Sequence, residues 1–460
     1  MSKATALSTA EKNSQRILSG SLTMAILSLA VPIVINNFIQ TLYNLTDTYL
    51  LGKLGTDEMA AISLVTPVQN VVINFGQGFT LAGAILISQY VGAGDNKGAR
   101  EMANQLLSIS MLFAVVFSLL CGGATPFIVD WLGAEGDVNK YGCTYLQIVL
   151  FDMPFLFMIN LFAAVNQAQG DTVRAMRLNM LGVVLNLILA PLFILVFRWG
   201  VAGAALSTLL AKIPCAVIAI KDLIKKDKPV YVELKLHKLK PQANKIIRIV
   251  KLGLPTAIGG STMQFGFLLM TKNVLVYGNS AMAAYGIGNR INSIITMPST
   301  AFGSATATIV GQNIGANQEE RANRAYIHAK FMIVTFLFIS GIILSRDFVS
   351  TAMVSIFSDD SEVIPMAADF LSIMAFCCFT NGVYDTTKGF FNGSGKTVVT
   401  MIIDATRLWV FRFLFLFIFS NIFKMEERSV WFAVVASNAL AAFVLWAYYR
   451  WGNYKKTVKN

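Results

Sequence analysis

The strongest constraint on this chain is an internal repeat at a fixed offset of 223 residues. Residues 32–100 align without a gap onto residues 255–323, and fifteen of the 69 aligned positions are identical. Both copies are strongly apolar, and the identities cluster at 55–61 and 89–93 of the first copy. Duplication of a hydrophobic half is typical of membrane transporters, whose substrate site lies between the two halves. The repeat therefore favours a transporter over a receptor or a membrane enzyme.

Composition supports a protein that crosses a membrane many times. Apolar residues make up 55% of the chain, charged residues 13%, and the mean hydropathy is +0.61, whereas a soluble domain carries about 25% charged residues. We count twelve apolar runs, six in each copy, that are long enough to cross the membrane as helices. They include 22–51, 326–345, 363–391, 397–421 and 430–450. The predicted fold is an all-α membrane protein of twelve transmembrane helices, in two six-helix lobes related by a parallel internal repeat.

Positive charge predicts the orientation of these spans, because Lys and Arg near span ends stay on the cytoplasmic side. Assigning alternate loops to one face places 24 of the 37 Lys and Arg there and six on the other face, while acidic residues divide 9 against 11. We therefore expect a multi-pass protein of the inner (plasma) membrane with both termini in the cytoplasm. The predicted segments are an N-terminal tail (1–21), an N-lobe (22–220), a basic connector (221–251), a C-lobe (252–451) and a C-terminal tail (452–460).

The connector 221–251 carries ten Lys or Arg and accounts for much of the net charge of +12. A basic run of this kind can bind nucleic acid or anionic lipid. We interpret it instead as a solvated cytoplasmic tether that follows the positive-inside rule, with no nucleic-acid partner. Because the entropy of loop closure changes slowly with length, we expect removal of a few residues from 228–240 to be tolerated.

The first span carries a polar stripe of Asn36, Gln40, Asn44 and Asp47, spaced 4, 4 and 3 residues apart, with Tyr43 beside it. Helical periodicity puts the stripe on one face. An Asp at mid-membrane costs about 2.5–3.5 kcal/mol, so this face is predicted to line a wet or protein-lined interior. The alternative is an interfacial Asp47 that caps or snorkels. A carboxylate in a dehydrated cavity takes up a proton more readily, which suits a proton carrier.

Other ionisable residues also fall inside the predicted spans. They are four acids (Asp152, Asp369, Asp385 and Asp404) and seven cations (Lys212, Lys272, Arg290, Lys330, Lys388, Arg407 and Arg412). Asp385 and Lys388 lie three residues apart, as do Asp404 and Arg407, so both pairs are predicted to be local ion pairs. Arg412 has no close partner in the sequence, and we expect it to line a second-half cavity with Arg290.

Motifs of soluble enzymes are absent from the sequence. The run 393–397 resembles the end of a phosphate-binding loop, but Phe390 stands where that motif needs glycine. Only two histidines exist, His237 and His328, which leaves no zinc or triad constellation. We therefore predict no catalytic residue, no metal site and no cofactor, and a transporter in place of an enzyme.

Four stretches carry a family resemblance through their order and spacing. They are 32–52 with Asn44-Leu45-Thr46-Asp47-Thr48, 169–172 with the downstream Leu185-Asn186, 309–316, and the second-half counterpart 392–397. Together they resemble the multidrug and toxic compound extrusion (MATE) family of efflux antiporters, over about residues 20 to 450. The resemblance implies two six-helix lobes around a central cavity and cation-driven export of amphipathic organic compounds, such as drugs or toxic cations.

The resemblance also implies a cation-coupling cluster in the first lobe. The positions that match the DinF-like branch are Tyr43, Asp47, Asn186 and Thr208, with Ala190 in place of that branch's fifth-span acid. The NorM-like branch uses second-lobe acids, where this chain has Gln264 nearby and Asn381, so the DinF-like pattern is the closer one. With one carboxylate lost, we favour H⁺ as the coupling ion, with Na⁺ as the alternative.

The remaining expectations concern the substrate and the partners. The residues predicted to line the substrate cavity are Asn36, Gln40, Asn44, Asn160, Gln264, Arg290, Asp385 and Arg412. The expected partners are a small organic substrate and the lipid bilayer, and the protein is expected to work as a monomer. The alternative function is a lipid-linked glycan flippase of the same superfamily, because the second-half cations Lys272, Arg290, Arg407 and Arg412 would suit a diphosphate.

Overall fold

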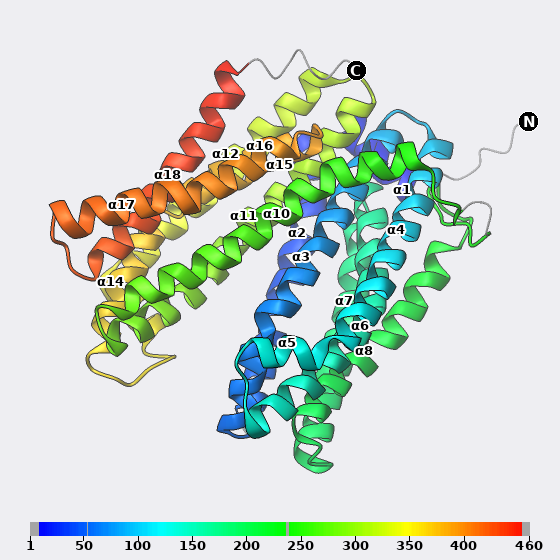
Figure 1. Cartoon of the computed structure of the whole chain (residues 1–460). Helices are drawn as coiled ribbons and strands as arrows, with labels where there is room; N and C mark the ends of the chain where they lie inside the picture. Colours follow the sequence, from blue (N-terminus) through cyan, green and yellow to red (C-terminus); the bar gives the residue numbers. More distant parts are fainter. Residues whose placement is uncertain (1–8, 53, 236–238, 453–460) are drawn as a thin grey trace, which may run out of the picture. The chain divides into compact units, whose positions relative to one another are not determined.

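The computed structural model describes residues 9–52, 54–235 and 239–452. Every regular element within these ranges is a helix (Figure 1), which confirms the predicted all-α fold. The outer parts of the predicted tails 1–21 and 452–460, and His237 in the connector, lie outside the described residues.

The first half of the chain holds the helices of the first repeat. They are α1 (Thr9–Ser19), α2 (Leu22–Leu51), α3 (Thr56–Gly92), α4 (Asn96–Gly123), α5 (Thr125–Trp131), α6 (Gly136–Ala168), α7 (Thr172–Pro191) with the π-helical turn η1 (Leu192–Val196), and α8 (Gly200–Leu223). The long helix α2 has the limits predicted for the first span. Helix α7 ends at Pro191, which has no N–H to donate to an α-helical hydrogen bond. The hydrogen bonding changes from α-helical to π-helical directly after it, in η1.

The second half repeats this order. Its helices are α10 (Ala243–Leu275), α11 (Asn279–Gly315), α12 (Glu319–Leu344), α13 (Asp347–Val354), α14 (Val363–Phe376), α15 (Phe379–Gly393), α16 (Thr397–Thr406), the π-helical turn η2 (Arg407–Arg412), α17 (Phe413–Phe417), the π-helical turn η3 (Ile418–Ile422) and α18 (Arg428–Trp451). The predicted span 363–391 is thus divided between α14 and α15, and 397–421 is interrupted by the two π-helical turns.

Length and hydropathy mark eight of the described helices as membrane spans, and a ninth when α14 and α15, bent by 51°, count as one. These are α2, α3, α4, α6, α7 with η1, α8, α12 and α18, plus the bent pair. Helices α10 and α11 and the interrupted run from α16 to η3 complete the set of twelve. The first two occupy the places that α2 and α3 hold in the other copy of the repeat, and they contain more polar residues.

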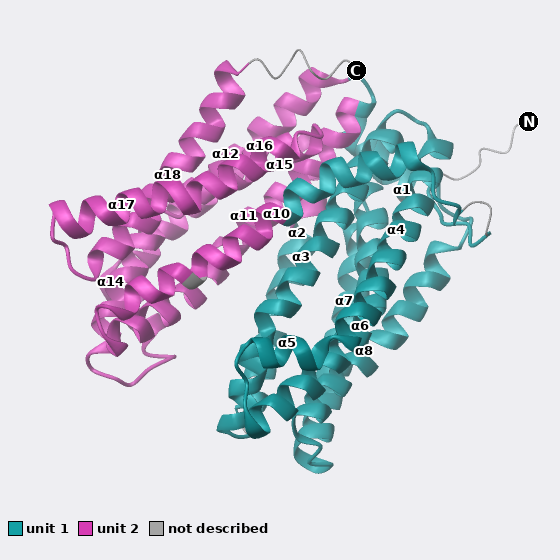
Figure 2. Cartoon of the chain, viewed as in Figure 1, with its two compact units in different colours: residues 1–21, 31–257, 315–317 teal, residues 22–30, 258–314, 318–460 magenta. Residues whose placement is uncertain are grey.

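The described residues form two compact units (Figure 2). Unit 1 comprises the described part of 1–21 with 31–257 and 315–317, and unit 2 comprises 22–30, 258–314 and the described part of 318–460. Helix α2 therefore contributes its first residues to unit 2 and the rest to unit 1, while α10 contributes to both in the opposite order. Pro32 and Pro255, which match in the repeat, lie close to these two crossover points.

The turn after α3 recurs after α11. Gly94 and Asn317, one repeat apart, both adopt left-handed backbone conformations, with φ of 73° and 59°. In each turn an N–H reaches back five residues: Asp95 donates to the Tyr90 carbonyl at 3.0 Å, and Gln318 donates to the Asn313 carbonyl at 2.8 Å. This is the hydrogen-bond pattern of a glycine-type helix end. Helices α3 and α11 therefore end at matched positions of the repeat, at Gly92 and Gly315.

A second matched turn supports the proposed counterpart of 169–172. Gly170 and Gly395 have φ of 80° and 76°, respectively. The next residue again donates five residues back, Asp171 to Asn166 at 2.9 Å and Lys396 to Phe391 at 2.8 Å. The two halves therefore share local backbone geometry where few side chains are identical.

Each unit has its own apolar core. In unit 1, α6 packs against α3, α4 and α8, and the ring of Phe113 stacks on that of Phe117 at 4.2 Å between centroids. In unit 2, α15 packs against α12 and α18, and the buried Trp431 meets Phe370 edge to face at 4.8 Å. Buried side chains in both units therefore lie inside helix bundles, and a polar residue found there needs a partner within the protein.

The connector is not the solvated tether that we expected. Helix α8 ends at Leu223 and α10 begins at Ala243. Between them, the side chains of Val230 and Val232 are buried in the core of unit 1. Lys228 is also buried and pairs with Asp222. Burial lowers the pKa of the Lys228 ammonium from its ordinary value, and the hydrogen bond to Asp222 opposes that shift.

Two buried side chains of α4 hold this segment in place. The Asn104 carbonyl oxygen accepts the Glu233 N–H at 2.9 Å. Gln105 donates to the Lys240 carbonyl at 3.0 Å and accepts the Gln242 N–H at 2.8 Å. Backbone groups outside regular structure need partners when water is excluded, and these amides supply them. The expectation of a solvated segment was wrong because it counted only the charges, and tolerance of deletions within 228–240 stays a prediction.

Candidate functional site

Unit 1 encloses a cavity of about 790 Å³ between α2, α3, α6, α7 and α8. Its polar lining comes from all five helices and consists of Asn36, Gln40, Tyr43, Asn44, Asp47, Thr48, Ser63, Thr66, Gln69, Asn70, Gln77, Tyr145, Asn160, Asn179, Asn186, Thr208 and Lys212. The polar stripe of the first span therefore faces a protein-lined interior, as its cost in lipid required.

The four residues matched to the DinF-like cluster lie in this one cavity. The Tyr43 hydroxyl is 3.5 Å from the Thr208 hydroxyl, and the Asn186 amide donates to that hydroxyl at 3.1 Å. Asp47 lines the same cavity one turn along α2 and is half-buried. It forms no hydrogen bond or ion pair with a described residue. A carboxylate in this state is available to bind a proton or an ion.

Ala190 occupies an apolar place beside the cavity. Its side chain is 1% exposed and packs in a cluster that includes Ile62, Ile194 and Val201. A carboxylate here would be surrounded by hydrocarbon, which is costly unless a cation accompanies it. The fifth span therefore has no second acid near Asp47, and the apolar packing around Ala190 would disfavour one at this position.

A buried ion pair next to Asp47 escaped the sequence interpretation. The Lys212 ammonium, from α8, lines the cavity and contacts the Asp152 carboxylate of α6. Asp152 is 1% exposed, and its second oxygen accepts no hydrogen bond within the described part of the chain. Lys212 also acts electrostatically on Asp47. The one ammonium thus contacts the Asp152 carboxylate and acts on the Asp47 carboxylate without contacting it.

The sequence did contain a signal for this pair. Asp152 and Lys212 lie inside predicted spans, and neither has an oppositely charged residue three or four positions away. Intramembrane charges normally neutralise one another, so each had to find a partner on another helix. Which helix supplies it depends on the packing of α6 against α8.

The other first-half residues predicted to bind substrate also line this cavity. The Asn179 amide donates to the Asn36 side-chain oxygen at 3.0 Å, and Gln40 donates to Asn44 at 3.4 Å. Asn160 reaches the cavity from α6. Amide side chains on four of its five helices thus offer both donors and acceptors to a bound molecule.

The predicted second-half residues belong to unit 2 and are dispersed within it. Gln264 on α10 and Arg290 on α11 are exposed. Arg412 is buried, and its guanidinium donates to the Ser437 hydroxyl at 3.1 Å and to the Asn438 side chain at 2.9 Å. Neutral oxygens therefore satisfy this cation, in a place where the sequence offered it no nearby acid.

Asp385 and Lys388 do not form the local pair that we predicted. The Lys388 ammonium contacts Asp404 at 2.6 Å, and Asp385 accepts a hydrogen bond from the Ser299 hydroxyl at 2.6 Å instead. Asp404 also lies 3.8 Å from Arg407, as expected. Asp404 is buried, so water does not screen its charge. Two nearby cations, Lys388 and Arg407, therefore stabilise the Asp404 carboxylate more than Arg407 alone would.

Comparison with known proteins identifies the family. The MatE family model matches residues 32–192 and 255–418. The probable multidrug resistance protein YpnP of Bacillus subtilis is 26% identical over 444 residues, which covers 95% of this chain and 96% of that protein. The multidrug export protein MepA of Staphylococcus aureus is 25% identical over 428 residues and 92% of each chain.

Solved structures show the same fold. A crystal structure of MATE in complex with MaL6 superposes with a TM-score of 0.90 at 25% identity, over 97% of this chain and 100% of that one. The outward-facing conformation of a multidrug resistance MATE family transporter of the MOP superfamily also gives 0.90 at 25% identity, over 96% and 99% of the two chains. The family match spans both copies of the internal repeat, and the chain therefore belongs to the MatE family of secondary transporters and is not an enzyme.

Proposed function

We propose that this protein is a proton-coupled exporter of small amphipathic organic compounds, which works as a monomer in the plasma membrane. The observation that carries the proposal is the unpaired Asp47 in a polar cavity, next to the Lys212–Asp152 ion pair. The names of its relatives, a multidrug resistance protein and a multidrug export protein, support drug-like molecules as the substrate class.

The lining of the unit 1 cavity supports an amphipathic substrate. A volume of about 790 Å³ suits a drug-sized molecule. Amides such as Gln69 and Asn70 stand beside apolar residues such as Ile73, Val149 and Leu156. Such a surface can hold an apolar body and hydrogen-bond a polar group on the same molecule.

The charges of the cavity argue against a lipid-linked glycan flippase. A diphosphate needs several cations, and Lys212 is the one cation among the described lining residues. Its ammonium is already held by Asp152. The unit 1 cavity therefore does not support the flippase alternative.

The same charges favour H⁺ over Na⁺. A sodium ion prefers several oxygen ligands, and the apolar cluster around Ala190 supplies none of them. It would also enter a cavity that already contains the Lys212 ammonium. We infer that Lys212 provides from within the protein the positive charge that an inorganic cation would otherwise bring.

Proton transfer can then be written for named groups. When Asp47 is ionised, it and Asp152 compete for Lys212. A proton taken up by Asp47 neutralises that carboxylate, so the ammonium belongs to Asp152 alone. Release of the proton on the other side of the membrane restores the competition. The two states differ in charge at the end of the cavity where Tyr43, Asn186 and Thr208 meet.

The test is Asp47→Asn, assayed by export of the organic cation ethidium from vesicles under an imposed pH gradient. The variant keeps the size of the side chain and removes a charge that is costly in the membrane, so we expect normal folding and ethidium binding but no pH-driven export. Asp57→Asn, at the exposed start of α3, is the matched control and should export normally.

Two outcomes would contradict the proposal. Normal pH dependence in Asp47→Asn would make Asp47 structural and turn attention to Asp385 or Asp404. Export by the unaltered protein that follows a sodium gradient at constant pH would show that the ion is wrong.

A further inference from the structure

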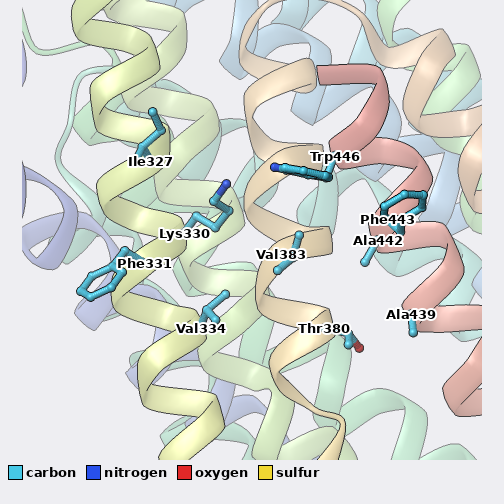
Figure 3. Close-up of a pocket in the computed structure, with 10 residues that line it drawn as sticks. All are labelled: Ile327, Lys330, Phe331, Val334, Thr380, Val383, Ala439, Ala442, Phe443 and Trp446. Carbon is cyan, nitrogen blue, oxygen red and sulfur yellow. The ribbon is translucent and has the colours of Figure 1, made fainter. Parts of the chain in front are cut away.

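A groove of about 430 Å³ lies on unit 2, where α12, α15 and α18 meet (Figure 3). Its walls are almost entirely apolar, with Phe331 and Val334 from α12, Val383 from α15, and Ala439 and Phe443 from α18. Lys330 is the one charged residue among the described lining residues. The polar atoms that remain come from Thr380 and Trp446.

We propose that this groove binds an anionic glycerophospholipid, with one acyl chain in the groove and the phosphate on Lys330. The side chain of Phe331 is 71% exposed. On a membrane-spanning helix, an exposed ring of this kind faces the lipid. A groove in that surface holds one acyl chain more firmly than a flat helix face, because the chain contacts protein on more than one side.

The charge of Lys330 selects the headgroup. Its ammonium lies 4.9 Å from the ring centroid of Tyr326, and it pairs with no carboxylate in the part of the chain that the structure describes. Charges within membrane helices normally have a partner of opposite sign. The indole N–H of Trp446 offers a second donor, and Figure 3 shows its nitrogen and the Lys330 amine directed into the same space between α12 and α18.

The depth of these two residues suits a phosphate. Lys330 lies four residues inside the predicted start of span 326–345, and Trp446 lies four residues inside the predicted end of span 430–450. At 1.5 Å per residue, each is about 6 Å from the predicted cytoplasmic surface. Trp is enriched at this level, and lysine side chains reach toward the headgroups from it. Basic pockets between helices on the cytoplasmic side are a known form of headgroup site.

The acyl chain would extend from that level toward the middle of the membrane. Phe331 and Val334 succeed Lys330 along α12, while Ala439 precedes Trp446 on the antiparallel α18. Polar and apolar parts of the groove are therefore arranged in the order of a phospholipid.

The experiment is native mass spectrometry of the full chain, delipidated in detergent and titrated with dioleoylphosphatidylglycerol or dioleoylphosphatidylcholine. Lys330→Gln should weaken phosphatidylglycerol binding about fivefold, which corresponds to about 1 kcal/mol for one basic residue at an anionic headgroup. Binding of phosphatidylcholine should not change. Arg450→Gln, which removes an exposed cation at the same end of α18 outside the groove, is the matched control and should bind both lipids normally.

A second variant tests the groove independently of charge. Ala439→Phe fills it and should remove one bound phosphatidylglycerol per chain. Equal binding of the two lipids by the unaltered protein, or an equal loss in Arg450→Gln and Lys330→Gln, would overturn the proposal. A dimer that Ala439→Phe dissociates would show that a second copy of the chain occupies the groove instead.

Discussion

Removing the Lys212 ammonium should destabilise unit 1 more than removing the Asp152 charge does. The Asp152 side chain is 2% exposed and the Lys212 side chain 23%. Lys212→Met leaves a carboxylate with almost no access to water and no cation in contact with it. Asp152→Asn leaves an ammonium that still faces a polar cavity and can turn toward Asp47.

The magnitude follows from the energetics of buried ion pairs. Loss of one partner costs about 3–5 kcal/mol when the other stays charged, whereas replacing both by neutral groups is close to neutral. For a unit of this size, about 2–4 °C in Tm accompanies each kcal/mol, so Lys212→Met should lower the Tm by roughly 10 °C. We expect about half that loss for Asp152→Asn, and a Tm near the wild-type value for the double variant.

Thermal unfolding of the four proteins of this double-mutant cycle, purified in one detergent, measures the coupling directly. Acidification should recover part of the loss in Lys212→Met, because a protonated Asp152 no longer carries a buried charge. Lys272→Met, which removes an exposed cation of α10, controls for a general effect of the substitution. Wild-type stability of Lys212→Met, or a double variant less stable than either single one, would refute the reasoning.

Two further predictions concern packing. Gly389→Ala should lower the free energy of unfolding by about 1–3 kcal/mol, because a Cβ there would lie 2.1 Å from the Gly303 carbonyl oxygen and the backbones of α15 and α11 would have to separate. Gly286→Ala on α11 is the control, because a Cβ there meets nothing within 4 Å. Equal Tm values for the two variants would contradict the close approach of α15 and α11. Gln105→Ala should release the connector from α4 and speed tryptic cleavage near residue 240, since two part-buried backbone groups lose hydrogen bonds worth about 0.5–1.5 kcal/mol each. An unchanged cleavage rate would mean that Gln105 does not anchor the segment.

Much of this protein could be derived from local patterns in its sequence. The limits of α2 and the polar face of Asn36 to Asp47 both depend on hydropathy and periodicity along one stretch of the chain. The internal repeat predicted the same order of spans in the second half. Hydropathy then assigned the helices to a membrane, because a helix is the element whose backbone groups are satisfied without water.

Partners distant in the sequence were decided by the tertiary structure alone. Asp152 finds Lys212 on another helix, and Lys388 turns to Asp404 in preference to the acid three residues before it. The connector docks on Gln105 despite its many charges. In each case the local pattern left several possible partners of similar energy. Packed helices exclude water, and an unpaired polar group there is far more costly than at a surface. The packing of the helices therefore selected the partner.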